Sequence, residues 1–174
     1  MSKNKVINFL NSIGIPTIKG YVPIMSFLPG ILIKQGTLIY NGKATLGDML
    51  HEAGHLAIVP GKYRKFMSGK LDRSIKRIYR MAKASDELDN PDAPIARQLM
   101  QASESEATAW AWAVGKFLNI AEEEIILDNT YEGKGANERA KLSANCHFGI
   151  NGLRASGMVE SVKTYPKLTR WVQP

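Results

Sequence analysis

The stretch from His51 to His55 constrains this chain more than any other. It holds two of the three histidines, four residues apart, with Glu52 directly after the first. On an α-helix, which turns about 100° per residue, positions i and i+4 lie one above the other, so both imidazoles can reach one metal ion. Glu52 lies one step round the helix, where its carboxylate would meet a water on that metal rather than the metal itself.

The flanking residues predict that this stretch is helical. Thr45 followed by Asp48 has the form of a capping box, a hydroxyl at the N-cap with a carboxylate three residues on. The pattern H-E-x-x-H on a helix is the signature of zinc metalloproteases, in which the glutamate acts as general base. Two alternatives stay open: the three motif residues can be surface residues that match by chance, and Asp48 can either orient a ligand or simply cap the helix.

A zinc site of this kind needs at least one further protein ligand and leaves a fourth position for water. One Cys and one other His remain, so a carboxylate is the expected third ligand. Residues 102–118 are rich in alanine and predict a helix, on which Glu106 falls within the apolar arc. A carboxylate there is costly unless it is paired or bound to metal, which makes Glu106 the predicted ligand. Glu104, on the polar side, is interpreted as a solvated charge near the helix N-terminus, although Glu104 as the ligand, or an ion pair for Glu106, are alternatives.

These two segments together resemble the ImmA/IrrE-type metallopeptidases. That family carries H-E-x-G-H on one helix and E-A-N-x-F-A on a later one; here the matching residues are His51 to His55, and Glu106-Ala107 followed by Trp110-Ala111. The resemblance covers about residues 1 to 118 and implies a zincin-like fold, Zn²⁺ bound by His51, His55 and Glu106, and a peptidase that acts on helix-turn-helix repressors. Thr108 and Trp110 depart from the family's Asn and Phe.

The fold class predicted for the chain is α+β, as one zincin-like domain over residues 1–174. A helix is expected over 3–12, followed by a small antiparallel sheet or hairpin with strands at 31–33 and 37–40, joined at Gln35-Gly36 and packed on the motif helix. The strand at 38–41, or its neighbour, is either a peptide-binding edge or part of a core hairpin. The C-terminal half is expected to be mostly helical.

Residues 62–83 form the most basic part of the protein and supply much of its formal net charge of +7. Apolar residues recur there at helical spacing, so the segment predicts an amphipathic helix with a cationic outer face. That face is interpreted as a solvated surface balanced by the acidic residues at 86–92. Contact with an acidic partner or with nucleic acid is the alternative.

His147, in a helix predicted over 136–150, is the candidate that stabilises the oxyanion, ahead of Tyr131 and Tyr165; the alternative is an ordinary helical histidine at the edge of the core. The combined prediction is a zinc metallopeptidase with Glu52 as base and a protein or peptide substrate. The alternative is a non-catalytic metal-binding module that binds a protein partner or nucleic acid. The single Cys146 suits a reducing cytoplasm, and no apolar stretch approaches the length of a membrane span.

Overall fold

The architecture is organised around one buried helix, α2 (Leu46–Ile58), which carries the H-E-x-x-H residues. The computed structural model describes residues 3–26, 28–90 and 92–174. Helix α2 begins with the predicted capping box: Thr45 Oγ1 accepts from the Asp48 backbone N–H at 3.0 Å, and Asp48 Oδ2 accepts from the Thr45 N–H at 3.4 Å. The predicted α+β class is confirmed.

The sheet has three strands, β1 (Thr17–Lys19), β2 (Ile31–Lys34) and β3 (Thr37–Tyr40), in the order β1-β3-β2. The predicted hairpin is present, with β2 and β3 antiparallel, but β1 pairs with β3 in parallel, so the sheet is mixed rather than antiparallel. Because β3 is the central strand, both of its edges are already paired. The prediction that residues 38–41 offer an edge to a peptide is therefore wrong for β3 itself.

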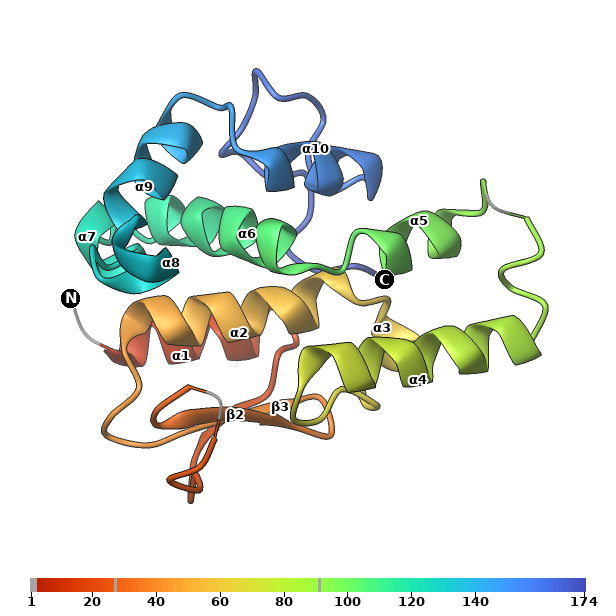
Figure 1. Cartoon of the computed structure of the whole chain (residues 1–174), viewed down its shortest axis with the longest axis horizontal. Helices are drawn as coiled ribbons and strands as arrows, with labels where there is room; N and C mark the ends of the chain where they lie inside the picture. The colour runs from red at the N-terminus through yellow and green to blue at the C-terminus, as the bar shows by residue number, and fades with distance from the viewer. Residues whose placement is uncertain (1–2, 27, 91) are drawn as a thin grey trace.

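The elements stack in layers on either side of α2 (Figure 1). The sheet covers one side of this helix, together with α1 (Lys3–Ser12), and α6 (Glu104–Phe117) packs along the opposite side. Helix α10 (Phe148–Ala155) lies on the far side of α6. Helix α6 is thus enclosed between two helices and is buried continuously from Glu106 to Gly115.

The remaining helices are α3 (Gly61–Arg64), α4 (Leu71–Ala84), α5 (Pro94–Met100), α7 (Glu122–Ile125), α8 (Thr130–Gly133) and α9 (Gly135–Ser143). The C-terminal half is mostly helical, as predicted, but the single helix expected over 136–150 is wrong. The chain ends α9 near Asn145, which has a positive φ of 54°, and starts α10 after His147. No helix of the described residues is long and apolar enough to cross a membrane.

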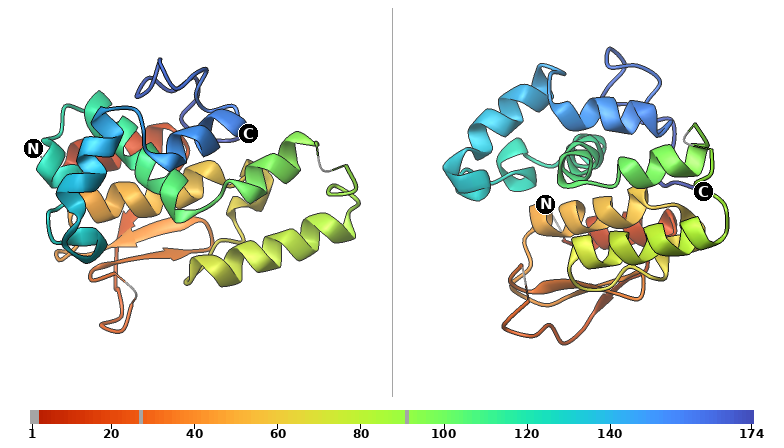
Figure 2. Two further views of the ribbon diagram at one scale, coloured as in Figure 1. Left: turned by 45° about the horizontal axis from the view of Figure 1, so that its top comes forward. Right: turned by 45° about the vertical axis from the view of Figure 1, so that its right-hand side comes forward.

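Close packing fixes how α2 and α6 lie together. A Cβ placed on Gly54 of α2 would lie 2.8 Å from the backbone oxygen of Ala107 and 3.0 Å from its Cα. The two backbones can approach this closely because position 54 has no side chain. The C-terminal segment then returns to the end of α2, where the Gln173 N–H donates to the Ala57 carbonyl at 2.8 Å (Figure 2).

Candidate metal centre

Three side chains from α2 and α6 converge beside the start of α6. Nε2 of His51 lies 2.9 Å, and Nε2 of His55 lies 3.5 Å, from the same carboxylate oxygen of Glu104. The two imidazole rings are perpendicular, with centroids 4.8 Å apart. The ligand atoms of the three residues all lie within 4.8 Å of one another, so this group can hold a metal ion.

The third member of this group is Glu104 and not Glu106, which corrects the predicted ligand set. Glu106 is only 2% exposed, but its carboxylate accepts from the Ser103 hydroxyl and lies against Gly152 of α10. The sequence-based prediction chose Glu106 as the ligand because it expected that carboxylate to be buried. Because α6 is covered by α2 on one side and by α10 on another, a buried residue can face away from the histidines. Glu104, four residues before Thr108, lies on the side of α6 that faces α2.

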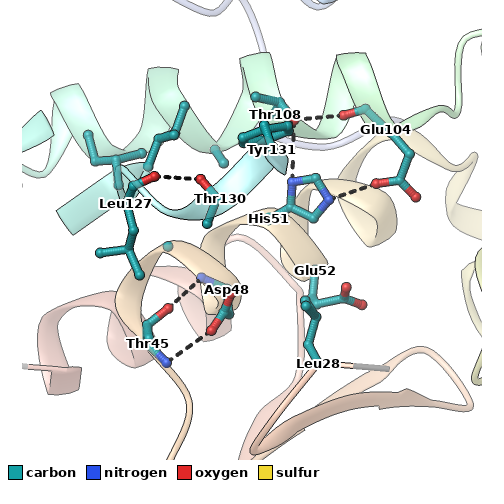
Figure 3. Close-up of a pocket in the computed structure, with 14 residues that line it drawn as sticks. Leu28, Thr45, Asp48, His51, Glu52, Glu104, Thr108, Leu127, Thr130 and Tyr131 are labelled. Atoms are coloured by element: carbon teal, nitrogen blue, oxygen red, sulfur yellow. Dashed lines mark hydrogen bonds and ion pairs between the residues drawn. The ribbon is translucent and has the colours of Figure 1, made fainter. Parts of the chain in front are cut away.

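A short hydrogen-bond network holds His51 from the other side of its ring (Figure 3). Thr108 Oγ1 lies 3.4 Å from His51 Nδ1, donates to the Glu104 carbonyl at 2.9 Å, and lies 2.7 Å from the Tyr131 hydroxyl. Since the single proton of Thr108 goes to the carbonyl, its oxygen can accept from both His51 and Tyr131. In the metal-free protein, His51 Nε2 can donate to Glu104. With a metal bound, donation from Nδ1 to Thr108 would leave the Nε2 lone pair of a neutral His51 for the ion.

The cluster opens into a cavity of about 280 Å³ between α2, α6 and the segment from 125 to 131. Glu52 lines it beside His51, near Leu28, and its carboxylate belongs to none of the cluster contacts (Figure 3). Asp48 also lines the cavity while capping α2. The apolar part of the lining comes from Leu28, Ala111, Ile125, Ile126 and Leu127.

Burial and neighbouring charges set the protonation of the groups around the cavity. Burial is the largest cause that raises the pKa of Glu52; the neighbouring His55 and His51 lower it, and Glu104 and Asp48 raise it. Hydrogen bonds from His51 and His55 hold the pKa of Glu104 far below its usual range, so Glu104 is an anion. Burial also raises the pKa of Tyr131, which keeps its phenol protonated and able to donate.

His147, the predicted oxyanion group, does not line this cavity. Its Nδ1 accepts from the Gly149 N–H at 3.1 Å as the N-cap of α10, and its Nε2 lies 3.3 Å from Glu138. Both ring nitrogens therefore have structural partners, and the predicted catalytic role is corrected to that of a helix cap. Tyr131 lines the cavity, whereas Tyr165 is 3% exposed and donates to the Ala109 carbonyl.

The donor set fits a divalent cation of the zinc type. Two imidazole nitrogens and a carboxylate oxygen are ligands that Zn²⁺ takes at about 2.0 to 2.2 Å, which separates neighbouring ligands of a tetrahedral site by roughly 3.4 Å. The observed separations of 2.9 and 3.5 Å from Glu104 to the histidines bracket that value. His55 is 3% exposed, and its Nε2 faces the Glu104 carboxylate. Its Nδ1 has no hydrogen-bond partner among the described residues, and a metal held at Nε2 would not supply one.

Comparison with known proteins yields no match to a family model, to a curated protein or to a solved structure. The site therefore rests on its own geometry. Sequence reasoning undervalued Glu104, Thr108 and Tyr131. For the first two, a signal was present: Glu104 and Thr108 repeat on α6 the i, i+4 spacing of His51 and His55 on α2.

Proposed function

We propose that this chain is a zinc-dependent metallopeptidase in which His51, His55 and Glu104 hold the metal and Glu52 is the general base. The observation that carries the proposal is the convergence of two imidazole Nε2 atoms on one oxygen of Glu104, beside a cavity that Glu52 also lines. A zincin-like fold is part of the same proposal, supported by the position of the motif helix between a small sheet and a helix that supplies a carboxylate.

Each residue has a distinct part in the proposed hydrolysis. When bound, Zn²⁺ polarises a peptide carbonyl and makes a water molecule more acidic. Glu52 accepts a proton from the attacking water on its carboxylate and passes it to the nitrogen of the leaving amine. Thr108 orients the His51 ring through Nδ1. Tyr131, whose phenol lies in the cavity wall, turns its O–H from Thr108 Oγ1 to the carbonyl oxygen as negative charge develops there.

The cavity favours a peptide with an apolar side chain next to the bond that is cut. Its wall from Ile125 to Leu127, with Leu28 and Ala111, can cover such a side chain, while Asp48, Glu52 and Glu104 disfavour an acidic one. The resemblance to ImmA/IrrE proteins adds a regulatory protein, such as a helix-turn-helix repressor, as the candidate substrate. That resemblance supports the class through His51 to His55, but its second motif puts the ligand at Glu106, which faces α10 instead.

A matched pair of variants on α6 tests the ligand set. Glu104→Gln and Glu106→Gln each remove one negative charge, two residues apart on the same helix. We expect Glu104→Gln to weaken zinc binding by more than the roughly 10- to 100-fold typical of an outer-shell partner. We expect Glu106→Gln to keep zinc and to lose stability only. Zinc affinity measured by competition with a chelating dye decides this, and the reverse order would return the ligand role to Glu106.

The catalytic half is tested with Glu52→Gln, which leaves the metal ligands untouched. This variant is expected to keep stoichiometric zinc, measured by mass spectrometry of the purified protein, and to lose cleavage of fluorogenic peptides with Leu or Phe beside the scissile bond. Cleavage that survives in Glu52→Gln would remove Glu52 as the base. Tight zinc binding without hydrolysis in the wild type would favour the non-catalytic module.

A further inference from the structure

Helix α4 presents a row of cations that no acidic residue balances. From Lys70 to Lys83 there is a single acid, Asp72. The six cations are exposed, and within the part of the chain that the structure describes none of them lies within 4 Å of a carboxylate; they are Lys70, Arg73, Lys76, Arg77, Arg80 and Lys83. Among the described residues, the acidic side chains of segment 86–92 form no ion pair with these six cations. Glu87 of that segment instead contacts Lys62 and Tyr63.

The orientation of this row is fixed by the opposite face of the helix. Ser74, Ile78 and Ala82 are buried, at 4%, 0% and 0% exposure, so α4 is anchored through them and keeps its cations outward. Arg73 and Lys83 are ten residues apart, which separates them by about 15 Å along the helix axis. The result is an elongated cationic edge, on a helix that lies beyond the end of the motif helix α2 (Figure 1).

Two of the cations near this edge are gathered at one hollow beside the hairpin turn. Gln35, Lys65, Phe66, Ser68 and Arg77 line it. The Lys65 ammonium is 5.2 Å, and the Arg77 guanidinium 5.3 Å, from the centre of the same Phe66 ring. The Ser68 oxygen accepts from the Gln35 N–H at 2.7 Å, which leaves its own proton for a ligand oxygen. Both cations border the hollow, so an anion bound there would be attracted to each of them.

We infer that this edge binds the phosphate backbone of nucleic acid, with the hollow at Lys65 and Arg77 as one phosphate subsite. A row of Arg and Lys residues spread over several phosphate spacings matches a polyanion of uniform charge. The buried face of α4 packs on the core, and Tyr79, at 49% exposure, is the one large apolar side chain of this described helix that is exposed, which is less apolar surface than an interfacial helix needs to enter a membrane. This binding is independent of the proposed hydrolysis, because the residues involved are separate from the metal cluster.

Fluorescence anisotropy of the full-length protein with a fluorescein-labelled 20-base-pair duplex of arbitrary sequence tests the inference. The Lys76→Glu/Arg77→Glu variant is compared with Lys163→Glu/Lys167→Glu, which changes the net charge equally at exposed cations of the C-terminal segment. Each phosphate contact steepens the salt dependence by about 0.9, a factor of about 8 per contact at 0.1 M salt. We expect the α4 variant to bind about 60-fold more weakly with a shallower slope, and the control to change less than about 3-fold.

Several outcomes would overturn the inference. Equal weakening in the two charge variants would reduce the effect to net charge, and a wild type without salt-sensitive binding would remove it altogether. Sedimentation with phosphatidylserine vesicles, or tighter binding of polyglutamate than of the duplex, would assign the edge to a membrane or to an acidic protein. Circular dichroism verifies that both variants are folded. Glu52→Gln should bind the duplex as the wild type does, which separates this test from that of the peptidase.

Discussion

The contact between Gly54 and Ala107 leads to a prediction about both stability and the metal site. A Cβ at position 54 would meet the Ala107 oxygen at 2.8 Å, its Cα at 3.0 Å and its Cβ at 3.2 Å. Ordinary contacts begin at about 3.4 Å, and backbone atoms cannot rotate away, so Gly54→Ala must move α2 and α6 apart by roughly half an ångström. His51 and His55 lie on one of these helices and Glu104 on the other, so the same displacement separates the ligands.

Two opposing terms set the size of the effect. Replacing glycine by alanine inside a helix gains up to about 1 kcal/mol, whereas overpacking costs about 1 to 3 kcal/mol. We therefore expect Gly54→Ala to lower the free energy of unfolding by up to about 2 kcal/mol. Metal sites tolerate distance errors of only about 0.2 Å, so we also expect at least a roughly 10-fold loss of zinc affinity.

Urea unfolding of the metal-free protein and zinc competition measure the two effects. Gly42→Ala is the control, because a Cβ there meets nothing within 4 Å and should change stability by less than about 0.5 kcal/mol. If Gly54→Ala is more stable than the wild type, as helix propensity alone requires, then the close approach does not constrain the helices. If it is destabilised but binds zinc normally, then the helix spacing does not set the ligand geometry.

Three further predictions concern residues around the site and the fold. Thr108→Val should weaken zinc binding about 10- to 100-fold, measured by chelator competition, because it removes the partner of His51 Nδ1, and Thr108→Ser should restore it. Tyr131→Phe should lower kcat by about 100-fold or more in the peptide assay with zinc affinity unchanged, whereas Tyr165→Phe, which alters a buried hydroxyl, should change stability alone. Burial is the main cause that lowers the pKa of His147 from 6.5, so the folded protein resists its protonation. The stabilising contribution of neutral His147 is complete above pH 6.5 and is lost as pH falls through the interval between 6.5 and the folded pKa. The His147→Asn variant keeps an N-cap acceptor. The free energy of unfolding of this variant should therefore decline less between about pH 7.5 and 5.5 than that of the wild type.

The sequence-based prediction is correct for elements whose structure is determined by their own residues. The capping box at Thr45 fixes the start of α2, and the short apolar runs on either side of Gln35-Gly36 fix the β2–β3 hairpin. Strand β1 was not predicted, because a segment of three residues is too short to show a hydrophobic period. Its pairing is with β3, a parallel strand about twenty positions later in the sequence. The break between α9 and α10 was not predicted because Asn145 adopts a left-handed backbone, and no proline and no adjacent glycine marks that position in the sequence.

The proposed third ligand could not be derived from helix periodicity, because periodicity tells which residues are buried and not what buries them. Glu106 is buried against Gly152 of α10, and Glu104, at 65% side-chain exposure, faces the histidines at the mouth of a cavity. The open position of a metal held here has to border solvent, because water and substrate enter there. The exposed glutamate at the first turn of α6 thus satisfies the chemistry better than the buried one. The general rule that buried charge marks function selects the wrong residue when a helix is covered on two sides.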